Sequence, residues 1–167
     1  RGNHDDYVCR FDTCDVDNWV YNGGAWFVGL AWDEQREFAA QFRELPIAIE
    51  VETHGGLVGI VHADCPFPSW DQLRAALEAP ETAKQLMLTQ NTCMWSRSRI
   101  ELGETEGVYG LRALVVGHTP LHKPAALGNV IHIDTMGWRP QDGGYFTMLD
   151  LASLETIPPM PVKLSWD

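Results

Sequence analysis

The chain has 167 residues, of which 45% are apolar and 21% charged, a composition typical of one globular domain that buries about 70% of its unfolded surface. Its 12 Lys and Arg stand against 23 Asp and Glu, a formal net charge of −11. This acidity excludes broad nucleic-acid binding and means that any anionic substrate requires a local cation. No apolar run approaches the roughly 20 residues that span a bilayer, so we expect no membrane partner.

The cysteines give no sign of a metal or disulfide framework. Cys9, Cys14, Cys65 and Cys93 form no C-x-x-C pair, and a chain of this size and apolarity does not need disulfides for stability. We therefore expect reduced thiols in a cytoplasmic protein.

The first part of the chain shows little periodicity. Residues 6–32 are rich in aromatic side chains and predict an irregular segment, with a turn at 21–24. Asp33 is placed to cap a helix over 34–44, and Pro46 is placed to stop it.

Alternation of apolar and polar residues then predicts a β-hairpin. Residues 47–53 alternate as a half-buried strand does, and 57–61 follow a glycine turn as its partner. Ser69 or Asp71 is expected to start the next helix. The remaining predicted elements are helices near 70–79 and over 81–89, strands over 111–116, 130–133 and 145–151, and an extended or edge segment over 158–161. Strands alternating with helices indicate a mixed α/β fold.

Two histidines each follow an apolar strand directly. His62 comes after 57–61, and His118 comes after the predicted strand over 111–116. Open α/β sheets place ligand sites at such strand ends. Asn3 and His4 lie in a third, turn-like segment, and imidazole nitrogens with amide oxygens form a plausible half of a mixed metal site. The alternative is that the strand-end histidines are structural.

The other histidines are interpreted as structural. His54 is expected to be a solvated residue at the hairpin tip, and His132 lies within a predicted strand. His122 follows a proline in a loop, close enough to His118 to contribute locally.

Three ordered motifs carry a family resemblance. They are Arg1-Gly2-Asn3-His4-Asp5, Val61-His62-Ala63-Asp64 and Gly117-His118-Thr119-Pro120. In this order and strand context they resemble the signatures of the calcineurin-like metallophosphoesterases. Three further segments, 22–27, 95–100 and 133–135, resemble the bacterial and phage Ser/Thr protein phosphatases of the bacteriophage lambda type. The resemblance runs from residue 1 to about 151, with departures at Asp5, where Glu is common, and Met136, where Gly is usual.

The resemblance implies a fold and a domain organisation. The fold is a metallophosphoesterase sandwich, in which two mixed β-sheets are flanked by helices. The family's earlier Asp-x-His and Gly-Asp-x-x-Asp-Arg-Gly motifs do not occur in the sequence. Residues 1–167 are therefore expected to form the C-terminal portion of a single domain, without its first strands and helices and inactive by itself.

The resemblance also implies a chemistry. Asn3, His62 and His118 would ligate one of a pair of divalent metal ions, most plausibly Mn²⁺, with iron and zinc as alternatives. His4 would be the general acid, and Arg97 would bind the substrate phosphate. Arg99 is expected to be a solvated arginine. The implied substrate is a phosphoprotein or phosphopeptide.

Two other functions remain open. A symmetrical dinucleoside tetraphosphatase shares the Gly-Asn-His-Asp signature, although residues 62–66 and 95–99 favour the protein-phosphatase branch. A non-catalytic metal-binding or interaction remnant would explain the absent motifs, but it has no need to retain His4 and Arg97 together with the ligand set.

Overall fold

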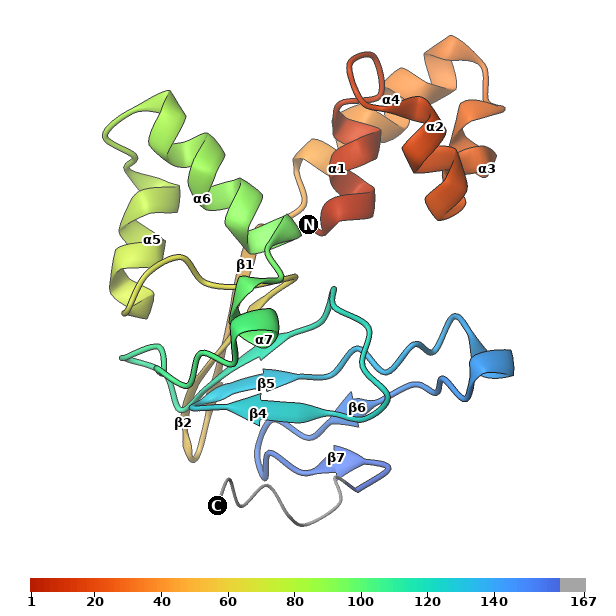
Figure 1. Cartoon of the computed structure of the whole chain (residues 1–167). Coiled ribbons are helices and arrows are strands. Elements are labelled where there is room, and N and C mark those ends of the chain that lie inside the picture. The colour runs from red at the N-terminus through yellow and green to blue at the C-terminus, as the bar shows by residue number, and fades with distance from the viewer. Residues whose placement is uncertain (160–167) are drawn as a thin grey trace.

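A mixed five-stranded sheet forms the centre of the computed structural model, which describes residues 1–159 (Figure 1). The strands are β1 (Ala48–Thr53), β2 (Gly56–Val61), β3 (Ala113–Val116), β4 (Ala125–Leu127), β5 (Val130–His132), β6 (Met148–Leu149) and β7 (Thr156–Ile157). The helical elements are α1 (Asn3–Cys9), α2 (Val16–Trp19), the π turn η1 (Val20–Gly24), α3 (Ala25–Val28), α4 (Trp32–Arg43), α5 (Trp70–Glu78), α6 (Ala83–Trp95), α7 (Ser98–Leu102) and the 3₁₀ turn η2 (Pro140–Asp142).

The prediction of an irregular segment over 6–32 is wrong, because this region folds into short helices that pack with α4. The side chain of Asp15 caps α2 by accepting a hydrogen bond from the Asn18 amide at 3.0 Å. Tyr7 stacks on Trp19, and Trp19 packs against Phe27 with ring centroids 4.8 Å apart. Helices of four residues are unstable alone, so burial of these aromatic rings stabilises them.

Two local predictions in this region have different outcomes. The predicted turn at 21–24 is present, because Gly23 adopts a φ of 98° that interrupts the helical path. The segment containing His4, expected to be turn-like, is instead the first turn of α1.

Helix α4 confirms the helix predicted over 34–44, but its start differs. Ala31 is the N-cap residue, and Asp33 lies inside the first turn. The carboxylate of Glu34 accepts a hydrogen bond from the Ala31 amide at 3.0 Å, which satisfies the helix start in place of an Asp33 cap. The helix ends at Arg43, before Pro46.

The sheet has the order β1-β2-β3-β5-β4. Strands β1 and β2 form the predicted antiparallel hairpin, whereas β2, β3 and β5 run parallel to one another. The short strand β4, which the sequence did not predict, pairs antiparallel with β5. Because β2, β3 and β5 are parallel, their carboxyl ends meet at one edge of the sheet.

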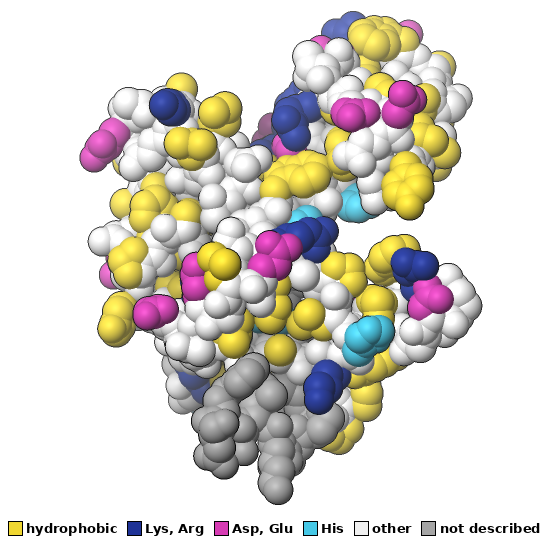
Figure 2. Space-filling model, viewed as in Figure 1, with side chains coloured by type: hydrophobic (Ala, Val, Ile, Leu, Met, Phe, Trp, Pro, Cys, Tyr) yellow, Lys and Arg dark blue, Asp and Glu magenta, His cyan; other side chains and the backbone are white. Residues whose placement is uncertain are grey.

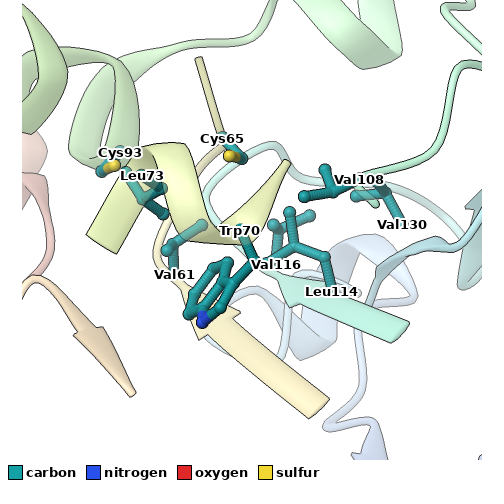
Figure 3. Packing of buried hydrophobic residues seen from close by; sticks show 9 residues of the cluster. All are labelled: Val61, Cys65, Trp70, Leu73, Cys93, Val108, Leu114, Val116 and Val130. Carbon is teal, nitrogen blue, oxygen red and sulfur yellow. The ribbon is translucent and has the colours of Figure 1, made fainter. Parts of the chain in front are cut away.

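Helices α5 and α6 pack together and cover the sheet core. Ser69, rather than Asp71, caps α5, and Thr82 caps α6. Helix α6 continues to Trp95, beyond its predicted end at 89. Figure 3 shows the buried cluster of Val61, Cys65, Trp70, Leu73, Cys93, Val108, Leu114, Val116 and Val130. All four cysteines are unpaired, and burial raises the pKa of the Cys93 thiol to about 12, so it behaves as an apolar core group.

The strand predicted over 145–151 is reduced to β6. Tyr145 makes only an isolated bridge with Met136, and the Asp150 carboxylate accepts hydrogen bonds from the Ala152 and Ser153 amides, which turns the chain after Leu149. Strand β7 pairs with β6 in a two-stranded ribbon. Of the segment predicted over 158–161, residues 158–159 follow β7 without extending it, and 160–161 lie outside the described residues.

The mixed α/β class is therefore confirmed, while the two-sheet sandwich stays a prediction. None of the helices within residues 1–159 combines the length and apolarity needed to cross a bilayer.

The prediction that Arg99 is solvated is wrong. Its side chain is only 8% exposed, and its Nε lies 2.7 Å from Oδ1 of the equally buried Asp64. Arg99 also donates a hydrogen bond to the carbonyl of Glu106 at 2.7 Å. The pair connects α7 to the loop after β2, so Arg99 has a structural role.

Breaking this pair from one side should destabilise the fold. We expect Arg99→Met to lower the free energy of unfolding by about 3–5 kcal/mol, because it leaves the Asp64 carboxylate buried without its partner. Urea denaturation followed by circular dichroism measures the change. The control is Arg139→Ala, which removes the half-exposed Arg139–Asp142 pair and should cost at most about 1 kcal/mol. Equal losses in the two variants would contradict the structural role of Arg99.

Candidate active site

The candidate site lies at the edge of the sheet where the parallel strands end. His62 is the first residue after β2, and His118 is the second residue after β3. The Gly117 amide donates a hydrogen bond to the His62 carbonyl at 2.9 Å, which joins the two loops beyond the ladder. Asn3, in the first turn of α1, meets the two histidines from the helical side.

Three potential ligand atoms converge at this point. His62 Nε2 lies 2.7 Å from Asn3 Oδ1 and 3.2 Å from His118 Nδ1. Asn3 and His118 are buried, and His62 is partly buried. The structure thus brings together the three residues that the sequence predicted as metal ligands. Within residues 1–159, no group of three or more His, Cys, Asp or Glu is arranged to hold a metal, and the third donor of this set is an amide oxygen.

The tautomer of His118 follows from its other contact. His118 Nε2 lies 3.1 Å from the carbonyl oxygen of Trp95. A carbonyl only accepts, so Nε2 carries the proton, and the lone pair of Nδ1 faces His62 Nε2. A histidine that ligates a metal typically donates its second N–H in this way.

Burial keeps both imidazoles neutral. It lowers the pKa of His62 to about 4, and it lowers the pKa of His118 to about 4, with a smaller contribution from the positive charge of Arg97. Neutral imidazole is the form that binds metal ions.

Close approach of the backbone also shapes the site. Gly2 has an ordinary φ of −108°, but a Cβ at this position would lie 2.7 Å from His62 Nδ1. The Gly2 amide donates a hydrogen bond to Asp5 Oδ2 at 2.7 Å, so Asp5 acts as a helix-capping residue.

Asn3, His62 and His118, which supply the three potential ligand atoms, line a cavity of about 1000 Å³. Figure 2 shows histidine and basic side chains in the hollow between the helical part and the sheet. Exposed His4 lines this cavity, as does Arg97, whose Nη1 donates to the His118 carbonyl at 3.0 Å. The lining residues are Asn3, His4, Tyr21, Asn22, Gly23, His62, Arg97, His118, Pro120, Asp134, Trp138, Arg139 and Gln141.

Sequence reasoning missed the aromatic rim of the cavity. Tyr21, from η1, is 88% exposed, and Trp138, before η2, is 65% exposed. The guanidinium of Arg139 lies 5.2 Å from the centroid of the Trp138 ring. A Trp-Arg pair in a glycine-rich loop after the third motif is the signal that could have identified this rim.

The remaining histidines lie outside the site. His54 is exposed in the turn between β1 and β2, and His122 is exposed and does not line the cavity. His132 is buried in β5.

Comparison with known proteins finds relatives with moderate sequence identity, although no protein-family model matches the chain. The chain is 30% identical over 142 residues to a serine/threonine-protein phosphatase 2 of Salmonella typhimurium, covering 80% of this chain and 59% of that protein. It is 29% identical over 142 residues to the protein of the same name from Escherichia coli, covering 81% of this chain and 60% of the relative. The chain thus spans about three fifths of the length of these relatives. As its motifs predicted, the chain is similar in sequence to serine/threonine protein phosphatases of bacteria.

Proposed function

We propose that this protein is a metal-dependent phosphatase that acts on phosphoserine and phosphothreonine in proteins. The observation that carries the proposal is the convergence of Asn3, His62 and His118 from three separate segments beside a cavity that His4 and Arg97 also line. Similarity to serine/threonine phosphatases supports the reaction class.

The donor set fits a divalent transition metal. One amide oxygen and two neutral imidazole nitrogens suit Mn²⁺, iron or zinc, and Mn²⁺ is our first choice because of the oxygen donor. His118 already directs a lone pair at the shared point. Divalent metals bound in such a centre polarise the phosphoryl group and activate the attacking water.

Arg97 is suited to bind the phosphate. Its bond to the His118 carbonyl holds the guanidinium against the ligand set, and the planar fork of N–H groups matches two phosphate oxygens. A local cation is necessary here, because the chain carries a net charge of −11 and repels anions at longer range.

His4 is suited to protonate the leaving group. It follows Asn3 directly on α1 and lines the same cavity as Arg97, so both side chains can face a substrate bound there. A Ser or Thr alkoxide is a poor leaving group, and a proton supplied at its oxygen lowers the barrier to P–O cleavage.

The reaction class can be tested with the natural full-length protein. We expect Mn²⁺-dependent release of phosphate from a phosphoserine peptide and little cleavage of diadenosine tetraphosphate. Phosphate release and nucleotide chromatography measure the two reactions. Faster cleavage of the dinucleotide would contradict the proposed substrate class.

The ligand assignment predicts a loss of metal binding. We expect His62→Ala or His118→Ala to abolish Mn²⁺ binding in titration calorimetry and, with it, hydrolysis of p-nitrophenyl phosphate, because each removes one converging donor. His54→Ala, at the exposed hairpin turn, is the matched control and should bind as the unmodified protein does. Near-normal turnover of either site variant in added Mn²⁺ would show that the assignment is wrong.

The role of His4 predicts a dependence on the leaving group. We expect His4→Asn to lower turnover of a phosphoserine peptide by about 10²–10⁴-fold. The loss with p-nitrophenyl phosphate should be much smaller, because nitrophenolate leaves without a proton. Mn²⁺ affinity should not change, and His122→Asn, an exposed histidine outside the cavity, is the control. Equal losses for both substrates would rule out a general-acid role.

A further inference from the structure

Asp6 is a buried carboxylate without a role in the proposed reaction. It lies on α1, three residues after Asn3, and is only 7% exposed. Its Oδ2 accepts a hydrogen bond from the indole Nε1 of Trp95 at 2.9 Å and lies 2.6 Å from Nη2 of Arg10. The Arg10 side chain is 52% exposed, so this ion pair along one helix contributes little to stability. The partly buried bond to Trp95, by contrast, joins α1 to the end of α6.

Trp95 makes contacts in two directions. Its indole binds Asp6 and packs edge-on against Tyr7, with ring centroids 5.0 Å apart. Its backbone carbonyl accepts the hydrogen bond from His118 Nε2 that fixes the tautomer of that imidazole. One residue therefore connects the helix that carries Asn3 with the histidine that follows β3.

We propose that Asp6 and Trp95 are positioning residues for the donor set, and this inference rests on the proposed metal site. Asn3 reaches that site from α1, whereas His118 reaches it from the sheet, so their alignment depends on how α1 sits against the end of α6. The Asp6–Trp95 bond holds that arrangement and orients the Trp95 carbonyl towards His118. Loss of such outer contacts typically lowers metal affinity by about 10–100-fold.

Matched variants separate this role from simple helix stability. Asp6→Ala removes the acceptor, and Trp95→Phe keeps a ring against Tyr7 but removes the indole N–H. Asp6→Asn retains an oxygen that accepts from the indole and should restore most of the affinity. Arg10→Ala removes only the half-exposed ion pair, so its Mn²⁺ affinity should equal that of the unmodified protein.

Two measurements on the 167-residue chain test the proposal. Titration calorimetry should show Mn²⁺ affinity lowered by about 10–100-fold in Asp6→Ala and Trp95→Phe. Long-range ¹H–¹⁵N NMR of the metal-free protein should show the His118 imidazole as one Nε2–H tautomer, which becomes a mixture in both variants. Circular dichroism checks that each variant is folded. If Asp6→Ala does not fold, the result for Trp95→Phe decides the question.

The outcomes distinguish the two proposals. Unchanged affinity and an unchanged tautomer in a folded Trp95→Phe variant would overturn the positioning role. Absence of Mn²⁺ binding by the unmodified chain would instead count against the proposed metal site. In that case the tautomer of metal-free His118 still decides whether Asp6 and Trp95 orient it.

Discussion

The candidate site depends on one hydrogen-bonded ladder, the parallel pairing of β2 with β3. The registers Val58 with Ala113 and Ile60 with Val115 set both strands to end at the same edge. A slip of one residue would turn the side chains of one strand to the opposite face and separate the two imidazoles. Apolar side chains of both strands, such as Val61 and Leu114, are buried in the sheet core. Burial of this apolar surface therefore stabilises the register, and the site itself does not need to do so.

The third donor comes from a different packing unit. Asn3 lies on α1, which is anchored through Tyr7 and Val8 in the aromatic cluster of the helical part. Contacts between α1 and α6 join this cluster to the sheet. Relative placement of the two clusters therefore determines whether the amide oxygen meets the imidazoles. The ends of β2 and β3 place His62 and His118 side by side. Asn3 joins them only if α1 packs correctly against the end of α6.

Sequence patterns predicted the sheet better than the helices. The hairpin β1–β2 and the strand ends before His62 and His118 follow from alternation and apolar runs, which are local signals. The helices over 3–28 were missed because their stability comes from rings far apart in sequence, such as Tyr7 and Trp19. Arg99 was misjudged for a related reason, since its partner Asp64 lies 35 residues away. The motifs identified the three side chains that converge, Asn3, His62 and His118, but the carbonyl of Trp95 carries no sequence signal, because every residue has one.

Gly2 imposes a constraint of volume rather than of backbone conformation. Its φ is available to any amino acid, so nothing about the chain path demands glycine there. What demands it is the imidazole of His62, which occupies the space that the smallest side chain would fill. Replacing Gly2 and keeping the orientation of His62 are thus incompatible unless both segments move. Any larger residue at position 2 therefore requires a smaller side chain at position 62 or a shift of the backbone, although the two positions lie 60 residues apart in sequence.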